Sequence, residues 1–546
     1  MLTKRARPSI SGVVMASGTE NTMILAVDLG TSGCKTAVCS LDGRVHSWSF
    51  KEVALHLRAG HGAEQDPHDW WNALISTSKE AIAKSQISPA QIKAICCSTQ
   101  GEGTVPVDAS GTPLMNAILW MDMRGAGHVN RAAGGPIRVA GYGPIKLWNW
   151  IRLTGGAPAL SGKDPFAHML FIRDEYPEVY DRTHKFLNVL DYLNLRLTGR
   201  FVATYDSILT SWVTDNRDSA NIHYNKGLLK SSGIDSNKFP EVVPCTETLG
   251  PVLPEVAEAM GLSTSTLVVA GAIDNSAAAI GSGAVRDGEA HFYIGTSSWI
   301  AAHMARKKTD VISSIASVPC AIPGKYLMTA MQTTAGGNLT FLKERVLYHE
   351  DELLREAHAP DVYKILDVIA ARTPAGSRGL MYMPWLYGER CPVEDRSLRA
   401  GLINLSLEHS REDIIRAFLE GVALNTRWMV PPVQKFLGHT LESITMVGGG
   451  AVSDIWCQIF ADTLGIQVHQ PEGPMETNVR GAVWIAAVGL GYMNYSDVSE
   501  RIRIQKVYEP IPEHKAVMNE SYHRFLQLHK KLAPLYRNWN RQEESK

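Results

Sequence analysis

The sequence predicts an α/β protein built from two similar halves. Two stretches, 24–41 and 291–302, carry this prediction, because each reads as an apolar run, a short tip rich in glycine, threonine and serine, and a second apolar run. Apolar runs of this length are typical of buried strands, so each stretch is expected to be a hairpin. One such hairpin could be an ordinary turn, but the second copy indicates a duplicated fold with two opposed tips.

The tip of the first hairpin has the residues of a phosphate site. Its glycines allow backbone N–H groups to approach a ligand, its hydroxyls add donors and its lysine adds positive charge. These residues are Gly30, Gly33, Thr31, Ser32 and Lys35. A carboxylate beside phosphates repels them unless a cation lies between, so we expect Asp28 to bind a metal ion, with magnesium favoured. The second tip, Gly295-Thr296-Ser297, lacks such an aspartate.

Composition argues against several classes of protein. The 54 Lys and Arg residues balance 55 Asp and Glu residues, so no basic excess indicates a nucleic-acid partner. No apolar run approaches the roughly 20 residues that span a bilayer, so no membrane partner is expected, and 482–490 is predicted to be a buried helix. The eight cysteines include no Cys-x-x-Cys pair, which favours reduced thiols and a cytoplasmic protein.

The first 22 residues differ in kind from the rest. They are basic near the start and carry no acid before Glu20. We expect a disordered leader, or a start placed too early, with Met15 or Met23 as the true first residue. A transit-like peptide is the less favoured reading.

Polar residues follow a buried strand that is predicted over 92–99. Ligands bind just past the carboxyl ends of strands in α/β sheets, so Gln100 and Glu102, with Gly101 between them, are candidates to bind substrate hydroxyls. The stretch 66–83 before this strand is predicted to be a helix that starts at an Asp-Pro pair.

Trp120, Asp122 and Arg124 form a second candidate group, because they would share one face of an extended segment. An aromatic ring beside a carboxylate and a guanidinium suits a polyhydroxylated molecule. A salt bridge beside a core tryptophan explains the same residues equally well. Residues 134–165, dotted with glycine and proline, are predicted to be a surface excursion, and 165–197 are expected to be mainly helical.

Asp274 is the candidate general base. It follows an apolar strand predicted over 266–273 and precedes a probable helix, where it could take a proton from a bound hydroxyl. Its alternative role is a helix N-cap. The proline-rich stretch 240–262 is predicted to link two domains, with their boundary near residue 270, so that the domains are 23–270 and 271–546.

The second half contains two further glycine-rich segments. Residues 333–338, which include Gly336, lead into a predicted helix. A strand over 444–447 runs into Gly448-Gly449-Gly450-Ala451, and a helix with Asp454 follows. Strand, triple glycine and helix form a nucleotide-cradle pattern, because glycines let a flat base or sugar lie against the backbone.

Taken together, these segments resemble the FGGY carbohydrate kinase family, and within it the xylulokinase-like branch. The motifs that carry the resemblance run in the family's order from about residue 24 to beyond 490. They are Asp28-Leu29-Gly30-Thr31-Ser32-Gly33, Glu64-Gln65-Asp66-Pro67 with Trp70-Trp71, Trp120 with Asp122 and Arg124, Asp274-Asn275, Gly295-Thr296-Ser297, Gly388-Glu389-Arg390 with Pro392, and Gly448-Gly449-Gly450-Ala451.

The resemblance implies two actin-like (ribonuclease-H-like) ATPase domains, the first for sugar and the second for nucleotide, with a cleft that closes on ATP, Mg²⁺ and a small sugar. It implies that Asp274 is the catalytic base and Asp28 the metal carboxylate. The implied substrate residues are Gln100, Gly101, Glu102, Trp120, Asp122, Arg124, Asp274 and Asn275. The implied nucleotide residues are Gly30, Thr31, Ser32, Lys35, Gly295, Thr296, Gly336, Gly450, Ala451 and Asp454.

Two departures from the family pattern concern the substrate. Xylulose enzymes of the family usually carry Gln-Met-His-Gly where this chain has Gln100-Gly101-Glu102-Gly103, whereas glycerol kinases carry a glutamate at the position of Glu102. The excursion over 134–165 looks longer than in relatives. The expected activity is transfer of the ATP γ-phosphate to a ketopentose such as xylulose. A polyol (glycerol, erythritol) or another ketose, and a non-catalytic actin-like protein that binds sugar and ATP, remain alternatives; a homodimer is left open.

Overall fold

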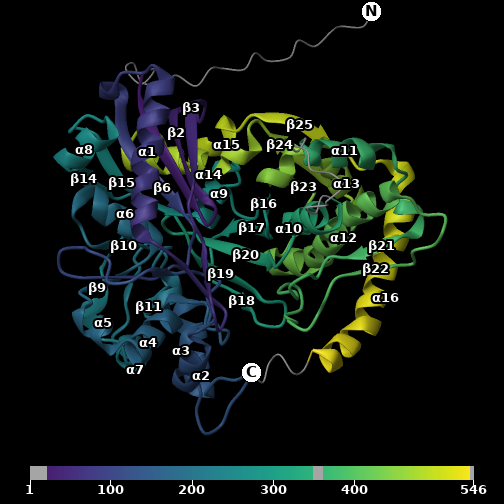
Figure 1. Ribbon diagram of the computed structural model, residues 1–546, viewed down its shortest axis with the longest axis horizontal. Coiled ribbons are helices and arrows are strands. Elements are labelled where there is room, and N and C mark those ends of the chain that lie inside the picture. The colour runs from purple at the N-terminus through teal and green to yellow at the C-terminus, as the bar shows by residue number, and fades with distance from the viewer. Residues whose placement is uncertain (1–20, 348–360, 541–546) are drawn as a thin grey trace, which may run out of the picture.

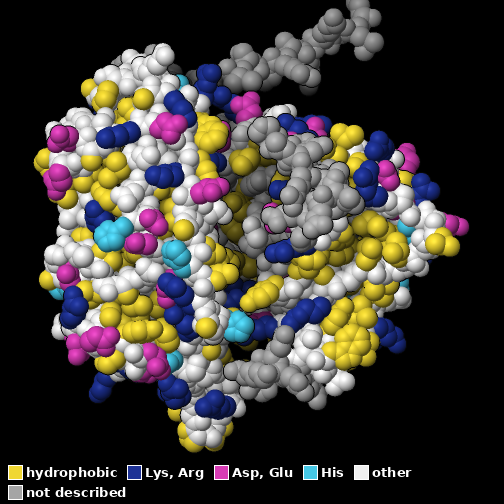
Figure 2. Space-filling model, in the orientation of Figure 1, with side chains coloured by type: hydrophobic (Ala, Val, Ile, Leu, Met, Phe, Trp, Pro, Cys, Tyr) yellow, Lys and Arg dark blue, Asp and Glu magenta, His cyan; other side chains and the backbone are white. Residues whose placement is uncertain are grey.

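The structure, a computed structural model, describes residues 21–347 and 361–540, so the predicted leader lies almost entirely outside the described residues. The chain forms two large mixed sheets, one in each half (Figure 1). The space-filling view shows that the surface is hollowed between the two halves (Figure 2). The strands of the first sheet are, in spatial order, β14 (Thr248–Pro251), β15 (Leu267–Ile273), β6 (Ile92–Thr99), β1 (Met23–Gly30), β2 (Gly33–Ser40) and β3 (Val45–Glu52). Those of the second are β18 (Thr309–Asp310), β19 (Ile315–Pro319), β20 (Tyr326–Gln332), β17 (Ser298–Met304), β16 (Ala290–Ile294), β23 (Ser443–Val447), β24 (Gln467–Pro471) and β25 (Ile504–Tyr508).

The two sheets repeat one pattern of strand directions. In the first sheet, β3 is antiparallel to β2 and β2 is antiparallel to β1. The strands β1, β6 and β15 are parallel to one another, and the edge strand β14 is antiparallel to β15. The series β20, β17, β16, β23, β24 and β25 has the same sequence of directions. This repetition confirms the duplicated α/β fold, and both predicted hairpins are present, as β1–β2 and β16–β17.

Two helices lie between the sheets: α9 (Asp274–Gly281) and α14 (Thr477–Gly489), which contains the predicted buried stretch. They share one apolar core with β1, β6, β15 and β17. Their backbones cross closely, because a Cβ on Gly481 would lie 2.0 Å from the Ala277 carbonyl oxygen and one on Gly281 would lie 1.9 Å from that of Thr477. The crossing places the start of α14, at Thr477, against the end of α9, at Gly281.

The predicted link over 240–262 is wrong. This stretch contains β13 (Glu241–Val243), β14 and α8 (Pro254–Met260), and β14 is the edge strand of the first sheet. The boundary expected near residue 270 falls inside β15, so the chain passes from the first sheet to the second between Ile273 and Ala290.

The first half also carries helices with a core of their own below the sheet (Figure 1). They are α2 (Ala126–Ala133), α3 (Pro144–Thr154), α4 (Pro165–Glu175), α5 (Pro177–Arg182) and α7 (Lys226–Ser232); α1 (Pro67–Ser85) and α6 (Val189–Thr198) pack on the sheet itself. The helix expected over 66–83 is confirmed as α1, whose N-cap Asp66 accepts a hydrogen bond from the His68 N–H at 2.8 Å. The excursion over 134–165 includes α3. The short strands are β4 (His56–Arg58), β5 (Gly62–Gln65), β7 (Val105–Val107), β8 (Ala117–Ile118), β9 (Lys185–Leu187), β10 (Val202–Thr204), β11 (Thr214–Asp215) and β12 (His223–Tyr224).

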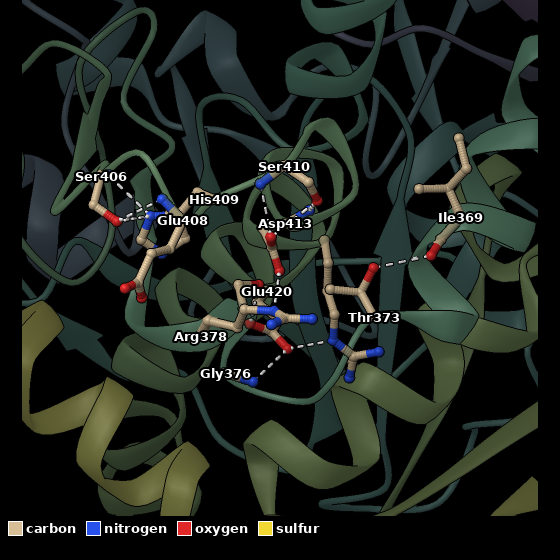
Figure 3. A network of polar contacts seen from close by, with 12 residues as sticks. Ile369, Thr373, Gly376, Arg378, Ser406, Glu408, His409, Ser410, Asp413 and Glu420 are labelled. Atoms are coloured by element: carbon tan, nitrogen blue, oxygen red, sulfur yellow. Dashed lines mark hydrogen bonds and ion pairs between the residues drawn. The ribbon is translucent and has the colours of Figure 1, made fainter.

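In the second half, helices cover the other face of the second sheet. They are α10 (Gly336–Phe341), α11 (Val362–Arg372), α12 (Arg411–Leu437) and α13 (Asp454–Leu464). The helix α16 (Lys515–Trp539) packs outside them against α12, α13 and the small sheet β21 (Met381–Met383) and β22 (Gly401–Ile403), whereas α15 (Val498–Arg501) packs on the core that contains α9 and α14. Polar contacts fix α12 at its start (Figure 3). Asp413 accepts from the Arg378 guanidinium at 3.1 Å, and Glu420 accepts from the Gly376 N–H at 2.9 Å. The anchored helix carries Asn425, which reaches the site described below.

Candidate active site between the two halves

Asp28 lies near the end of β1, half-buried and facing Asn478 of the second half. The Asn478 amide at the start of α14 donates to its carboxylate at 3.2 Å. Burial raises the pKa of Asp28, and Asn478 and Lys35 offset only part of that effect. Lys35 stands opposite Asp28 in the register of β1 and β2. Its ammonium group donates to the Met475 carbonyl oxygen at 3.3 Å and does not lie over the tip.

The two glycines of the first tip are glycine for different reasons. No described atom lies within 4 Å of the point that a Cβ on Gly30 would occupy, so the backbone there is open to a ligand. A Cβ on Gly33 would lie 2.4 Å from the Lys51 carbonyl oxygen, so Gly33 is needed for packing against β3. Ser32, between them, is exposed.

A buried hydrogen-bond network joins the first tip to the end of β6. The Thr31 hydroxyl donates to the Gln100 amide oxygen at 2.7 Å and accepts from the Trp120 indole at 3.0 Å. Gln65 donates to the Thr31 carbonyl at 2.8 Å, and its amide oxygen accepts from Gln100 at 2.9 Å and Trp70 at 3.0 Å. Gln100 and Thr31 are thus held by protein partners, and the sequence reasoning missed the part that Gln65 and Trp70 play.

The expected extended face of Trp120, Asp122 and Arg124 is wrong, because these residues lie in turns after β8. Asp122 is fully buried, accepts from the Ala63 N–H at 2.8 Å and pairs with Arg124 at 2.7 Å. Arg124 also pairs with Glu64 at 2.8 Å, so the charges of Asp122 and Arg124 are matched within the protein. Trp120, 37% exposed, is the member of this group that stays open to a ligand.

Asp274 is the first residue of α9, so the N-cap position is Ile273 and not Asp274. Its carboxylate accepts the Asn275 N–H at 2.8 Å. Burial, and then the negative charges of Asp28 and Asp206, raise the pKa of Asp274 to about 7. Asp206 is held in place by the Ile273 N–H at 3.1 Å and the Thr204 hydroxyl at 2.7 Å. Asp274 therefore has the protonation behaviour that a general base needs near neutral pH.

Glu102 follows β6 with a φ of 62° and belongs to a group of charges that includes Asp274. Burial and the neighbouring Asp164 raise the pKa of Glu102 to about 7, and Arg390 acts in the opposite direction. Asp164 accepts from the Trp212 indole and the Ala159 N–H, both at 2.6 Å, and burial raises its pKa to about 6.

Lys163 and Asp164 were not among the predicted site residues. They come from the end of the 134–165 excursion, which thus reaches the pocket, and the Lys163 ammonium group lies 5.7 Å from the ring centre of Tyr387 in the second half. Arg390 stands in a motif of the resemblance, but no role was predicted for it. For Lys163 and Asp164, the only sequence pattern that could have drawn attention to them was the helix start at Asp164-Pro165.

The second tip, at residues 295–297, is held against the segment that leads into α10. The Gly336 N–H donates to the Gly295 carbonyl at 2.8 Å, and the Ala335 N–H donates to that of Thr296 at 2.8 Å. A Cβ on Gly336 would lie 2.5 Å from the Gly295 carbonyl oxygen, so Gly336 is required for this contact. The buried Glu389 supports the same segment: it accepts from the Thr333 N–H at 2.9 Å and from the Asn425 amide of α12 at 2.5 Å.

The triple glycine also packs against the second tip. Cβ atoms on Gly448 and Gly450 would lie 2.6 Å and 2.8 Å from atoms of Ile294, the residue before the tip. Of the three, Gly449 opens to free space, with no described atom within 4 Å of its Cβ position. The backbone is therefore open at Gly449, whereas Gly448 and Gly450 permit close packing, and contact of the nucleotide with these glycines stays a prediction.

The neighbours of the triple glycine are engaged by the protein. The buried Ala451 accepts from the Gln470 amide through its carbonyl at 2.7 Å. The Asp454 carboxylate accepts from the Tyr508 hydroxyl at 2.7 Å and from the Lys506 ammonium at 3.0 Å, which lowers its pKa. Asp454 is thus tied to β25.

All eight cysteines are buried and free of disulfides. Over 21–347 and 361–540, no three His, Cys, Asp or Glu residues form a ready metal-binding group, and no helix has the length and apolar character needed to cross a bilayer.

Two family models match the chain: the N-terminal domain of the FGGY family of carbohydrate kinases over residues 23–281, and its C-terminal domain over residues 290–490. A xylulose kinase of Staphylococcus epidermidis is 29% identical over 94% of this chain and 97% of its own length. A gluconokinase of Bacillus subtilis is 26% identical, over 90% and 92%. The crystal structure of a ligand-bound xylulose kinase from Lactobacillus acidophilus has a TM-score of 0.81 at 21% identity, over 95% of this chain and all of that one. The likeness to this structure confirms the predicted pair of actin-like domains.

Proposed function

Since the chain belongs to the FGGY family of carbohydrate kinases and is an ATP-dependent sugar kinase, we propose that its acceptor is a ketopentose such as xylulose and that Asp274 is the general base. One observation carries the proposal: the half-buried Asp274 lies close enough to Asp28 and Glu102 for their charges to act on one another, and desolvation together with the charge of Asp28 raises the pKa of Asp274 to about 7. The acceptor is supported by relatives named xylulose kinase, which are 29% and 28% identical to this chain.

In the proposed reaction, Asp274 accepts the proton of the attacking sugar hydroxyl. That oxygen forms a bond to the γ-phosphorus of ATP, and the bond from this phosphorus to the bridging oxygen breaks, which releases ADP. A base with a pKa near 7 is about half deprotonated at neutral pH, so it can both take the proton and return it to water. Closure of the two halves would exclude water that otherwise attacks ATP.

Asp28 fits a divalent cation. Its half-buried carboxylate lies close enough to Asp274 for the two charges to interact, and desolvation leaves its pKa raised despite Asn478 and Lys35, so its negative charge lacks a full counter-charge. No ready group of metal-ligating side chains exists among the described residues, so a cation at Asp28 would take further ligands from phosphate oxygens and water, as Mg²⁺ commonly does. When bound, Mg²⁺ would neutralise charge on the phosphates.

The nucleotide is assigned to the second half. The proposal places the phosphates between the open backbone at Gly30 and the second tip, 295–297, with the adenosine along the open Gly449. Ser32 and Thr296 are the hydroxyl side chains offered to the phosphates, since Thr31 is bound to Gln100 and Trp120. The free buried thiols support a location in the reducing cytoplasm.

A polyol kinase is the second candidate, and Glu102 favours it. Glu102 stands where xylulose enzymes of the family usually carry a histidine and where glycerol kinases carry a glutamate, and a carboxylate there can accept hydrogen bonds from two adjacent hydroxyls of a polyol. Pocket geometry, not the motif set, separates such substrates, and one hydroxyl more or less changes the preference greatly.

The test is an assay of ADP release by the full chain with Mg²⁺ and a panel of acceptors: xylulose, ribulose, glycerol, erythritol and gluconate. The proposal predicts the highest kcat/KM for a ketopentose. A polyol as best acceptor supports the second candidate. ADP release that no acceptor stimulates would support the non-catalytic alternative and overturn both.

A further inference from the structure

Tyr293 belongs to the predicted second hairpin, but no role was assigned to it above. It is in β16, two residues before Gly295. Its neighbours Phe292 and Ile294 point into the core of the second half, whereas the ring of Tyr293 packs on the opposite core, which contains α9 and α14. Tyr293 therefore faces the helices that begin with Asp274 and carry Asn478.

The ring of Tyr293 is held rigidly. It stacks on the Trp299 indole of β17, with ring centres 4.0 Å apart and planes 4° from parallel. On its other side it lies against the tip: a Cβ on Gly295 would be 2.9 Å from the ring and 3.6 Å from the hydroxyl oxygen. Only glycine fits at residue 295 beside this ring, and the hydroxyl is placed next to the tip backbone.

The hydroxyl of Tyr293 has no hydrogen-bond partner among the described residues. Asp28 and Asp274 lie near enough for their charges to act on it, and with burial they raise the pKa of Tyr293, so the hydroxyl keeps its proton. Neither acid accepts that proton in a hydrogen bond of the described structure. The Tyr293 side chain is partly exposed, so its hydroxyl is a donor that the described protein leaves unpaired and that a ligand beside the tip can reach.

We propose that the Tyr293 hydroxyl donates a hydrogen bond to the phosphoryl group that passes from ATP to the acceptor. This inference rests on the proposed function, because it takes the second tip as a phosphate site. An anion bound between Asp28, Asp274 and Gly295 would reach the hydroxyl, because the charges of both acids act on it and Gly295 lies against the ring. A rigid neutral donor stabilises the negative charge that develops on the phosphoryl oxygens in the transition state, and it does not repel the substrate hydroxyl.

The test compares Tyr293→Phe with the wild type in the full chain. The variant keeps the stacked ring and loses only the donor. A hydrogen bond to an anion that strengthens in the transition state predicts a kcat about 10- to 100-fold lower, with KM for both substrates changed less than about threefold. The matched control is Tyr224→Phe, whose hydroxyl donates to the Pro240 carbonyl at 2.7 Å in the first half and touches neither tip; its kcat should stay unchanged.

A second measurement separates phosphoryl binding from packing. Calorimetric titration with Mg²⁺-ADP alone, and with Mg²⁺-ADP plus aluminium fluoride as a mimic of the transferred group, should show affinity lost only in the presence of the fluoride. Equal loss without fluoride, or kcat within twofold of the wild type, would overturn the role of Tyr293. If the wild type phosphorylates no acceptor of the panel, the proposed function fails; if it does and Tyr293→Phe matches it, only this inference fails.

Discussion

The crossing of α9 and α14 should tolerate no side chain at Gly481. The Cβ of Gly481→Ala would lie 2.0 Å from the Ala277 carbonyl oxygen, and the obstacle is backbone, so no side-chain rotation relieves it. An unstrained contact needs roughly 3.5 Å, so the helices would have to separate by about 1.5 Å. Overpacking of this kind costs on the order of 1–3 kcal/mol of folding free energy.

The same separation should reduce activity, because α9 starts at Asp274 and α14 positions Asn478 against Asp28. Misplacement of a reacting group by about 1 Å costs roughly 100-fold in rate. We expect Gly481→Ala to lower the melting temperature by several degrees in differential scanning calorimetry and kcat by about 100-fold.

The matched control is Gly127→Ala in α2, where the new Cβ would meet only the Arg131 side chain at 3.6 Å, an ordinary contact. That change should leave kcat unaltered and raise stability slightly, since alanine favours a helix over glycine by about 1 kcal/mol. A Gly481→Ala enzyme with wild-type kcat and an unchanged melting temperature would refute the argument that this crossing sets the site.

Three further predictions concern the site itself. The pKa of about 7 at Asp274 predicts that kcat/KM rises with pH and falls about tenfold per pH unit below 7, because the base must be deprotonated; a profile flat from pH 5 to 8 would contradict this. Glu102→Gln, measured in the ADP-release assay, should reduce kcat/KM for the best acceptor about 10-fold or more while KM for ATP stays constant. An unchanged ranking of acceptors and an unchanged rate would show that Glu102 does not bind the acceptor. Asn478→Ala, which removes the amide that orients Asp28, should weaken Mn²⁺ binding in the presence of ADP about 10-fold by electron paramagnetic resonance, and unchanged Mn²⁺ affinity would disprove that role.

Much of the fold was predictable because local patterns decide it. The two hairpins are apolar runs around glycine tips, and the sheet must bury such runs. The start of α1 follows from Asp66 and Pro67, whose capping and fixed φ act within one turn. The stretch 240–262 was misread because its prolines suggested a linker. Part of it is β14, which pairs with β15 at the edge of the sheet, and an edge strand tolerates proline.

The site was less predictable because its members meet only after folding. Asp164 reaches Glu102 from a segment some sixty residues away in the chain, and no periodicity connects them. Gly448 and Gly450 looked like ligand-contacting glycines, but the residue against which they pack, Ile294, belongs to another strand. Arg124 was read as a possible substrate residue because its partner Glu64 is sixty residues away in the sequence. Only the pairing of β5 with β8 brings the two side chains together.

The most direct test of the account is Asp274→Ala, measured with the best acceptor of the panel. The account predicts that kcat falls by about 100- to 10,000-fold, the usual contribution of a general base, while the Kd for Mg²⁺-ADP stays within about twofold of the wild type. Asp181→Asn, an exposed aspartate on α5, serves as the control and should behave as the wild type. An Asp274→Ala enzyme that keeps a substantial part of its kcat would contradict the assignment of Asp274 as the base.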